Sequence, residues 1–120
     1  MKTTFGFGKE SVVISNYVSG IPGGRNLNVE GYEGEVINGG HIIISKDGDY
    51  KPMPVKNGEY DALPEGYAYC GVLVSGVLTS KPFASIMTQG QVLEGAMPYG
   101  IDGIKEALKT ALPGINFIKE

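Results

Sequence analysis

The sequence predicts a mainly β fold with one short α-helix near the C-terminus. Glycine supplies 19 of the 120 residues, about twice its usual share, and glycine favours turns and places where chains approach closely. Several short runs of β-branched and aromatic residues are bounded by turn residues, as strands are. Only the stretch 101–112 places apolar residues at helical spacing. A chain of this length suits one domain.

A β-hairpin is predicted in the middle of the chain. The β-branched run at 41–45 forms its first strand. Asp47-Gly48 suits a type I′ turn, in which both central residues need positive φ. The returning strand contains Pro52 and Pro54. Because proline cannot donate a ladder hydrogen bond, we expect this strand to lie at a sheet edge.

The longest predicted strand covers residues 67–79, and apolar residues occupy both of its alternating faces. One face is expected to meet the core, and the other a second layer or a neighbouring subunit. We therefore predict a subunit interface on the second face. Its residues are Tyr67, Tyr69, Leu73 and Val77.

Three further elements complete the predicted fold. Residues 83–87 and 91–93 are expected to form a closing hairpin through Gln89-Gly90. An amphipathic helix is predicted over 101–112, ended by Pro113-Gly114. An extended apolar tail follows at 115–118.

Residues 1–35 are predicted to form an extended N-terminal arm outside a compact β-rich domain at 36–120. Seven of these 35 residues are glycine, and apolar residues gather in one place. Such a segment buries too little apolar surface to offset its ordering entropy, so we expect it to be irregular and mobile unless a partner holds it. The residues expected to contact that partner are Ser11, Val12, Val13, Ile14, Tyr17 and Val18.

Charge and composition argue against several partners. The net charge is -3 and the ten basic residues are spread along the chain, so neither nucleic acid nor an anionic membrane is expected to bind. No apolar run approaches the roughly 20 residues of a membrane span, and the N-terminus lacks the apolar segment of a secretory signal. Cys70 is the only cysteine, which excludes an internal disulfide.

No motif in the sequence predicts an enzyme. His41 is the only histidine and has no marked catalytic partners. Asp47-Gly48-Asp49 lacks the later ligands of a calcium loop, and the glycine-rich segments near residues 6 and 20 do not connect a strand to a helix as phosphate loops do. Cys70 is expected to be inert packing. We expect no cofactor, no metal and no small-molecule substrate.

The tyrosines leave two readings open. Tyrosine is enriched at protein interfaces, but it also favours strands for its own sake. The tyrosines concerned are Tyr50, Tyr60, Tyr67, Tyr69 and Tyr99.

The order of these features resembles the lambda-type phage head decoration proteins and the related phage head-fibre family. The resemblance is carried by the hairpin at 40–55, AYCGVL at 68–73, VLTSKPFA at 77–84, the closing hairpin at 83–93, the helix at 101–112 and GINF at 114–117. It covers about two thirds of the chain and concerns layout more than any single motif.

The resemblance implies a β-tulip domain, a small barrel of short strands that assembles as a homotrimer. It implies binding to the major capsid protein lattice on the capsid exterior, with the N-terminal arm ordered by that contact. The implied role is structural: stabilising the capsid. The chain would then be found in the virion, and in the host cytoplasm during assembly.

A second function is compatible with the same residues. The chain could be a small β-barrel binding module, monomeric or dimeric, that holds a carbohydrate or peptide through its tyrosines. Trimeric mass and virion association favour the first reading, whereas a monomer with a ligand-dependent melting temperature favours the second.

Overall fold

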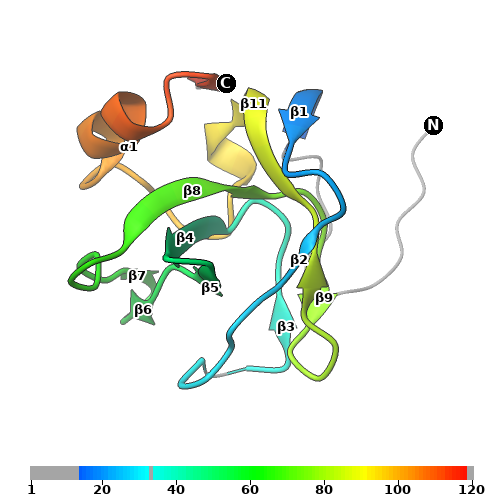
Figure 1. The fold of residues 1–120 in the computed structure, drawn as a ribbon. Coiled ribbons are helices and arrows are strands. Elements are labelled where there is room, and N and C mark those ends of the chain that lie inside the picture. The colour runs from blue at the N-terminus through cyan, green and yellow to red at the C-terminus, as the bar shows by residue number, and fades with distance from the viewer. Residues whose placement is uncertain (1–13, 33, 119–120) are drawn as a thin grey trace.

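Strands from both ends of the chain meet in one main sheet. A computed structural model describes residues 14–32 and 34–118, and within them this sheet has six strands (Figure 1). They are β1 (Ile14–Gly20), β4 (Ile42–Lys46), β5 (Asp49–Pro52), β8 (Ala68–Leu73), β11 (Ile86–Leu93) and β12 (Ile115–Ile118). The order across the sheet is β1-β11-β8-β4-β5, and β12 pairs in parallel with β11. Strands β1 and β5 therefore lie at opposite edges.

Short strands and two helices complete the fold. The small two-stranded sheets pair β2 (Arg25–Asn26) with β10 (Phe83–Ala84), β3 (Val36–Ile37) with β9 (Val77–Leu78), and β6 (Val55–Lys56) with β7 (Glu59–Tyr60). The 3-10 helix η1 covers Glu94–Ala96 and the α-helix α1 covers Lys105–Ala111. The prediction of a mainly β fold with one short α-helix is confirmed.

The predicted hairpin is β4–β5. Its turn residues Asp47 and Gly48 have φ of 48° and 87°, as a type I′ turn requires. Strand β5 forms the sheet edge, where Pro52 has no ladder bond to donate. The same turn chemistry recurs between β6 and β7, where Asn57 and Gly58 have φ of 56° and 77°.

The predicted closing hairpin is wrong, because Ile86–Leu93 is one continuous strand, β11. Gly90 does not turn the chain. It lies between β1 and β12, pairing with Tyr17 on one side and Ile115 on the other. Any side chain at Gly90 would collide with the carbonyl of Asn16, so glycine is needed here for close strand packing.

The long strand predicted over 67–79 is two strands, β8 and β9, separated by a bend after Leu73. Its predicted alternation is also broken within β8. Ile43 pairs with Gly71 but Ile44 pairs with Tyr69, which leaves Cys70 as an extra residue. This β-bulge reverses the phase of the side chains, so Tyr69 and Leu73 pack on different core clusters.

Helix α1 begins four residues later than predicted. Residues 102–104 form a turn that includes Gly103, a weak helix former, and Ile104 is the N-cap. The predicted apolar face still reaches the core, because Ile101, Leu108 and Leu112 are buried.

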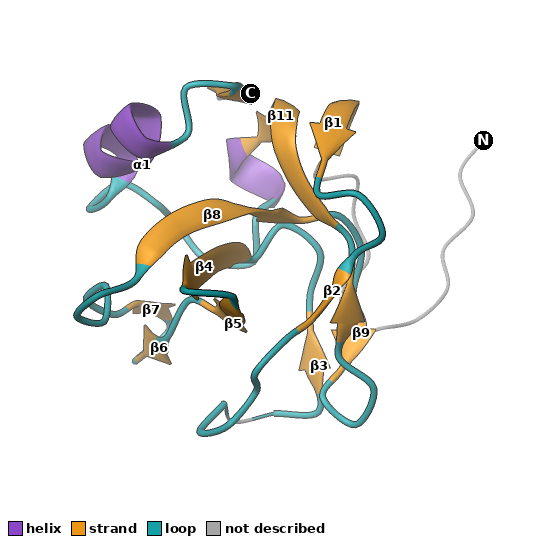
Figure 2. Cartoon of the chain, viewed as in Figure 1, coloured by secondary structure: helices purple, strands orange, loops and turns teal. Residues whose placement is uncertain are grey.

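Each face of the main sheet carries a buried apolar cluster, and α1 lies over one of the faces (Figure 2). On the face covered by α1, a large cluster includes Ile42, Ile44, Val72, Met87 and Leu108. On the other face, a smaller cluster is covered by β2, β3 and β10. It consists of Leu27, Ile37, Ile43, Leu73, Ala84 and Ile86. Burying each of these larger side chains contributes about 1.5–3 kcal/mol to the hydrophobic driving force.

The expectation of an irregular N-terminal arm fails for Ile14–Gly20. These residues form β1 and pair antiparallel with β11 from Val92 to Met87. Strand β11 supplies the backbone hydrogen bonds, so β1 belongs to the same sheet as the later strands. Residues 1–13 lie outside the described part of the chain.

Candidate functional site

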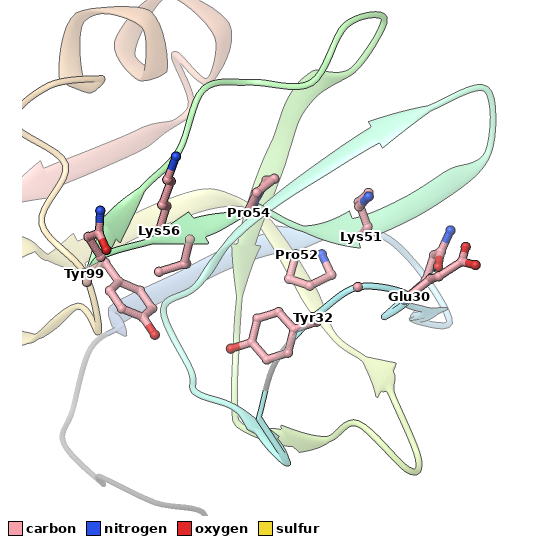
Figure 3. A pocket seen from close by; sticks show the side chains of 12 residues that line it. Glu30, Tyr32, Lys51, Pro52, Pro54, Lys56 and Tyr99 are labelled. Carbon is pink, nitrogen blue, oxygen red and sulfur yellow. Dashed lines mark hydrogen bonds between the residues drawn. The ribbon is translucent and has the colours of Figure 1, made fainter.

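A pocket of about 700 Å³ opens beside β5 and the β6–β7 hairpin (Figure 3). Four rings line it: Tyr32, Pro52, Pro54 and Tyr99. In Figure 3 the rings of Tyr32 and Tyr99 lie in the lower half of the view, and the amine groups of Lys51 and Lys56 point to the upper half. Aromatic and proline rings offer apolar faces, and the Tyr32 hydroxyl donates a long hydrogen bond to the Val36 carbonyl at 3.5 Å.

Polar side chains also line the pocket, and they are Asn28, Glu30, Lys51, Lys56 and Asn57. Lys51 belongs to the sheet edge, whereas Lys56 and Asn57 come from the exposed β6–β7 hairpin. Asn28 is held in place, because its Nδ2 donates to Asp49 and its Oδ1 accepts from the Glu30 amide at 3.1 Å. The pocket thus combines donors, acceptors and ring faces.

The tyrosine wall of the pocket is packed around His41. The imidazole lies 5.9 Å from the Tyr32 ring, 5.3 Å from Tyr60 and 5.7 Å from Tyr99, between ring centroids. All three contacts are edge-to-face, a favoured aromatic arrangement. The Tyr60 hydroxyl accepts a hydrogen bond from the Ile42 amide at 3.1 Å, which anchors the cluster to β4. The rings lining the pocket are therefore held by a buried scaffold.

His41 is fully buried beneath these rings. Its Nε2 lies 2.9 Å from the Met53 carbonyl, which can only accept, so Nε2 carries the proton and Nδ1 does not. Nδ1 is buried and has no hydrogen-bond partner among the described residues. Burial lowers the pKa of His41 to about 4, partly opposed by the bond to Met53. The imidazole is therefore neutral at pH 7 and screened from solvent.

A second polar group lies beside the pocket, around Asp49. Tyr67 donates a short hydrogen bond to the Asp49 carboxylate, and Asn28 donates another. These bonds, the Tyr67 bond first, lower the pKa of Asp49, with Lys51 and Lys46 adding to the effect. Both lysines also lie over the Tyr67 ring, at 5.4 Å and 5.9 Å.

The four residues predicted at a subunit interface do not share one surface. Leu73 is 0% exposed in the chain's own core, so its place in an interface is a wrong prediction. The chain's own second layer covers this face. Tyr67 and Tyr69 are half-buried against the large cluster, whereas Val77 packs against the small one.

Of the predicted arm contacts, Ile14, Tyr17 and Val18 lie in β1, and Ser11, Val12 and Val13 fall outside the described residues. Tyr17 is 53% exposed and Val18 is 60% exposed. Within residues 14–32 and 34–118, no strand pairs with the outer edge of β1. Register shifts interrupt its pairing with β11, and such bulges discourage indiscriminate strand addition.

Comparison with known proteins gave no match among family models, curated proteins or solved structures. In the part of the chain that the structure describes, no helix has the length and apolar character needed to cross a membrane. Nor do the described residues contain a group of three or more His, Cys, Asp or Glu side chains arranged to hold a metal.

Sequence reasoning missed the pocket as a site. The sequence indicates Tyr99 as a possible contact residue but not Tyr32, and it indicates Pro52 and Pro54 only as residues of a sheet edge. Their common position depends on the fold, since the contact that joins the Tyr99 ring to His41 links residues 58 apart in the sequence. A local signal existed only for the hairpin residues Asn57 and Gly58, whose turn presents Lys56.

Proposed function

We propose that this chain is a phage head decoration protein, a homotrimer that binds the major capsid protein lattice on the capsid exterior and stabilises it. The proposal rests on the resemblance in sequence layout and is compatible with the mainly β fold. The observation that carries it is the outer edge of β1, which pairs with no strand among the described residues and exposes Tyr17 and Val18. Edge strands accept extended segments of a partner through main-chain hydrogen bonds, with side-chain contacts giving specificity.

Capsid binding through β1 would stabilise the shell by mass action, since a ligand that binds only the assembled state favours that state. Three copies of β1 in one trimer would engage neighbouring capsid subunits together. The effective concentration of the second and third contacts then raises the overall affinity without strong individual contacts.

The trimer contact requires exposed apolar surface, which Leu73 does not provide. Support comes instead from residues next to Val77: Leu78 is 36% exposed and Phe83 is 58% exposed. They flank the turn at 79–82 between β9 and β10. We place the proposed trimer contact at Leu78 and Phe83, where apolar side chains would be removed from water on assembly.

Mixing the purified protein with bare expanded capsids of the phage that carries it, followed by imaging, tests the capsid contact. Wild type should decorate the particles, and Val18→Lys should lose binding while keeping its melting temperature, because Val18 is largely exposed. Val29→Lys is an unsuitable control since Val29 packs on the core. Asn116→Lys, at an exposed position of β12, is the matched control and should bind. Undecorated particles with wild type would refute the proposal.

Sedimentation tests the trimer independently. At micromolar concentration the wild type should sediment at three times the 12.7 kDa of one chain, and Phe83→Ser should shift it toward monomer. A monomeric wild type would contradict the trimer.

One observation favours the second function, a carbohydrate- or peptide-binding module: the ring-lined pocket beside β5. Its volume falls within the range of about 300–1,000 Å³ typical of ligand sites. A monomer that ignores capsids but binds a ligand there would favour the module over the decoration protein.

A further inference from the structure

The chain contains two Asn-Gly pairs, Asn38-Gly39 and Asn57-Gly58. In such a pair the backbone nitrogen of glycine can attack the side-chain carbonyl carbon of asparagine and close a succinimide ring. Glycine favours this reaction, because it has no side chain to block the approach of its nitrogen. The attack is intramolecular, so its rate depends on whether the fold lets the nitrogen and the carbon come together.

The Asn57-Gly58 pair lies at the tip of the β6–β7 hairpin, where residues 56–59 are all exposed. The hairpin has only two cross-strand residue pairs, so its tip can open at a small cost in free energy. Among the described residues, no hydrogen bond holds the Asn57 side chain or the Gly58 amide. Both reacting groups therefore lie where they can move and where water can reach them.

The Asn38-Gly39 pair lies between β3 and β4, where the fold restrains it. The Asn38 carbonyl accepts a hydrogen bond from the His41 amide at 3.2 Å, and the Gly40 amide donates to the Leu73 carbonyl at 2.8 Å. The side-chain Oδ1 of Asn38 is buried and has no hydrogen-bond partner among the described residues. Negative charge develops on this oxygen during the attack, and a buried oxygen without a donor leaves that charge unstabilised.

We propose that Asn57-Gly58 is a site of spontaneous modification, at which the Asn57 side-chain amide is replaced by a carboxylate, whereas the fold protects Asn38-Gly39. The Gly58 nitrogen forms a bond to Cγ of Asn57 and loses its proton. The Asn57 side-chain nitrogen takes up a proton and leaves as ammonia. Water then opens the ring at one of its two carbonyl carbons, which gives either aspartate or isoaspartate.

The two products differ in their effect on the turn. Asp47-Gly48 forms the β4–β5 turn with φ of 48° and 87°, close to the 56° and 77° of Asn57 and Gly58. The aspartate product therefore suits the same type I′ turn. Isoaspartate adds a methylene group to the backbone, so it should disturb the pairing of β6 with β7. Both products add one negative charge to the lining of the pocket beside β5, which includes Asn57.

Incubation of the folded full chain in water enriched in oxygen-18, at mildly alkaline pH, tests the proposal. Protease digestion and mass spectrometry measure how much of each asparagine has been converted with uptake of the label. We expect Asn57 to convert at least about tenfold faster than Asn38, because local opening exposes the hairpin tip more often than the core. In urea, where the fold no longer protects Asn38, the two pairs should convert at similar rates.

Two variants identify the product and the reason for the protection. Asn57→Asp should keep the melting temperature of the wild type, because the turn at Asp47-Gly48 already has this dipeptide. Aged wild type should gain an anion-exchange peak that elutes with this variant, and a second peak from isoaspartate. The matched variant Asn38→Asp places a carboxylate where Oδ1 is buried, and it should lower the melting temperature.

The proposal is overturned if Asn57 takes up no label in the folded chain, or if Asn38 takes it up at least as fast. A rate difference that persists in urea would show that the local sequence, and not the fold, protects Asn38. An Asn38→Asp variant that melts as wild type would contradict the same protection. No capsid or ligand is used, so these results are independent of the decoration function.

Discussion

The two edge strands of the main sheet differ in the backbone groups that they leave unpaired. At one edge, β1 leaves its outer backbone unpaired among the described residues and exposes Tyr17 and Val18. At the other, Pro52 has no amide proton to donate from β5, and the Tyr50 carbonyl already accepts a hydrogen bond from the Asn28 amide. The first edge keeps unpaired backbone donors and acceptors among the described residues, whereas the second has lost some of them. The two edges of one small sheet therefore differ in the backbone groups that they present.

Both edges are held in place by the middle of the sheet. Among the changes considered, Leu73→Ala should destabilise the middle of the sheet most. Leu73 is fully buried in the small cluster, so truncation should lower the free energy of unfolding by about 2–5 kcal/mol. Leu78→Ala, at a partly exposed position, is the control and should cost well under half as much in a monomeric state. Urea denaturation measures both. Equal and small losses of unfolding free energy in the two variants would contradict the burial of Leu73.

Acid should lower the free energy of unfolding through His41, which lies beneath the tyrosines of the pocket. The folded imidazole has a pKa of about 4 against an ordinary 6.5, so between these values the unfolded state binds more protons. Stability is thus present above pH 6.5 and falls as pH is lowered toward 4, by about 3 kcal/mol in all.

The variant His41→Phe isolates this effect, because carboxylates titrate equally in both proteins. Wild type should lose more unfolding free energy than the variant between pH 7 and pH 4, measured by denaturation at each pH. Parallel pH profiles would mean that protonation of His41 does not lower the free energy of unfolding. The β1 edge has no equivalent buried base among the described residues.

Tyr67→Phe should have the smallest effect, confined to the β5 edge. The Tyr67 hydrogen bond is the main reason that the pKa of Asp49 is low, so its loss should raise that pKa toward the ordinary value. An NMR titration of the Asp49 carboxyl carbon measures the change. Signals of β1 residues should not move. An unchanged Asp49 titration would show that the Asn28 hydrogen bond and the two lysines, and not Tyr67, keep the pKa of Asp49 low.

Local patterns were sufficient to predict some elements. The turn at Asp47-Gly48, the edge position of the proline-containing strand and the buried face of the C-terminal helix all depend on residues close together in the chain. Turn geometry, missing amide protons and helical spacing act over a few residues, so the sequence carries them directly.

Other features depended on segments that meet only in the folded chain. Gly90 looked like a turn residue but permits three strands to pack closely. The bulge at Cys70 placed Tyr69 and Leu73 on opposite sides, and Ile14–Gly20 became a strand because β11 supplied its partners. Periodicity in the sequence records none of these non-local pairings.

By itself, the sequence determined the fold class, the main hairpin and which edge a proline would close, since these follow from local backbone chemistry. Tertiary structure alone decided that Tyr32, Pro52 and Tyr99 line one pocket, and that the two tyrosines pack on a buried imidazole. Such a site requires distant segments to be packed together, and the free energy for that packing comes from the shared core and not from any one segment.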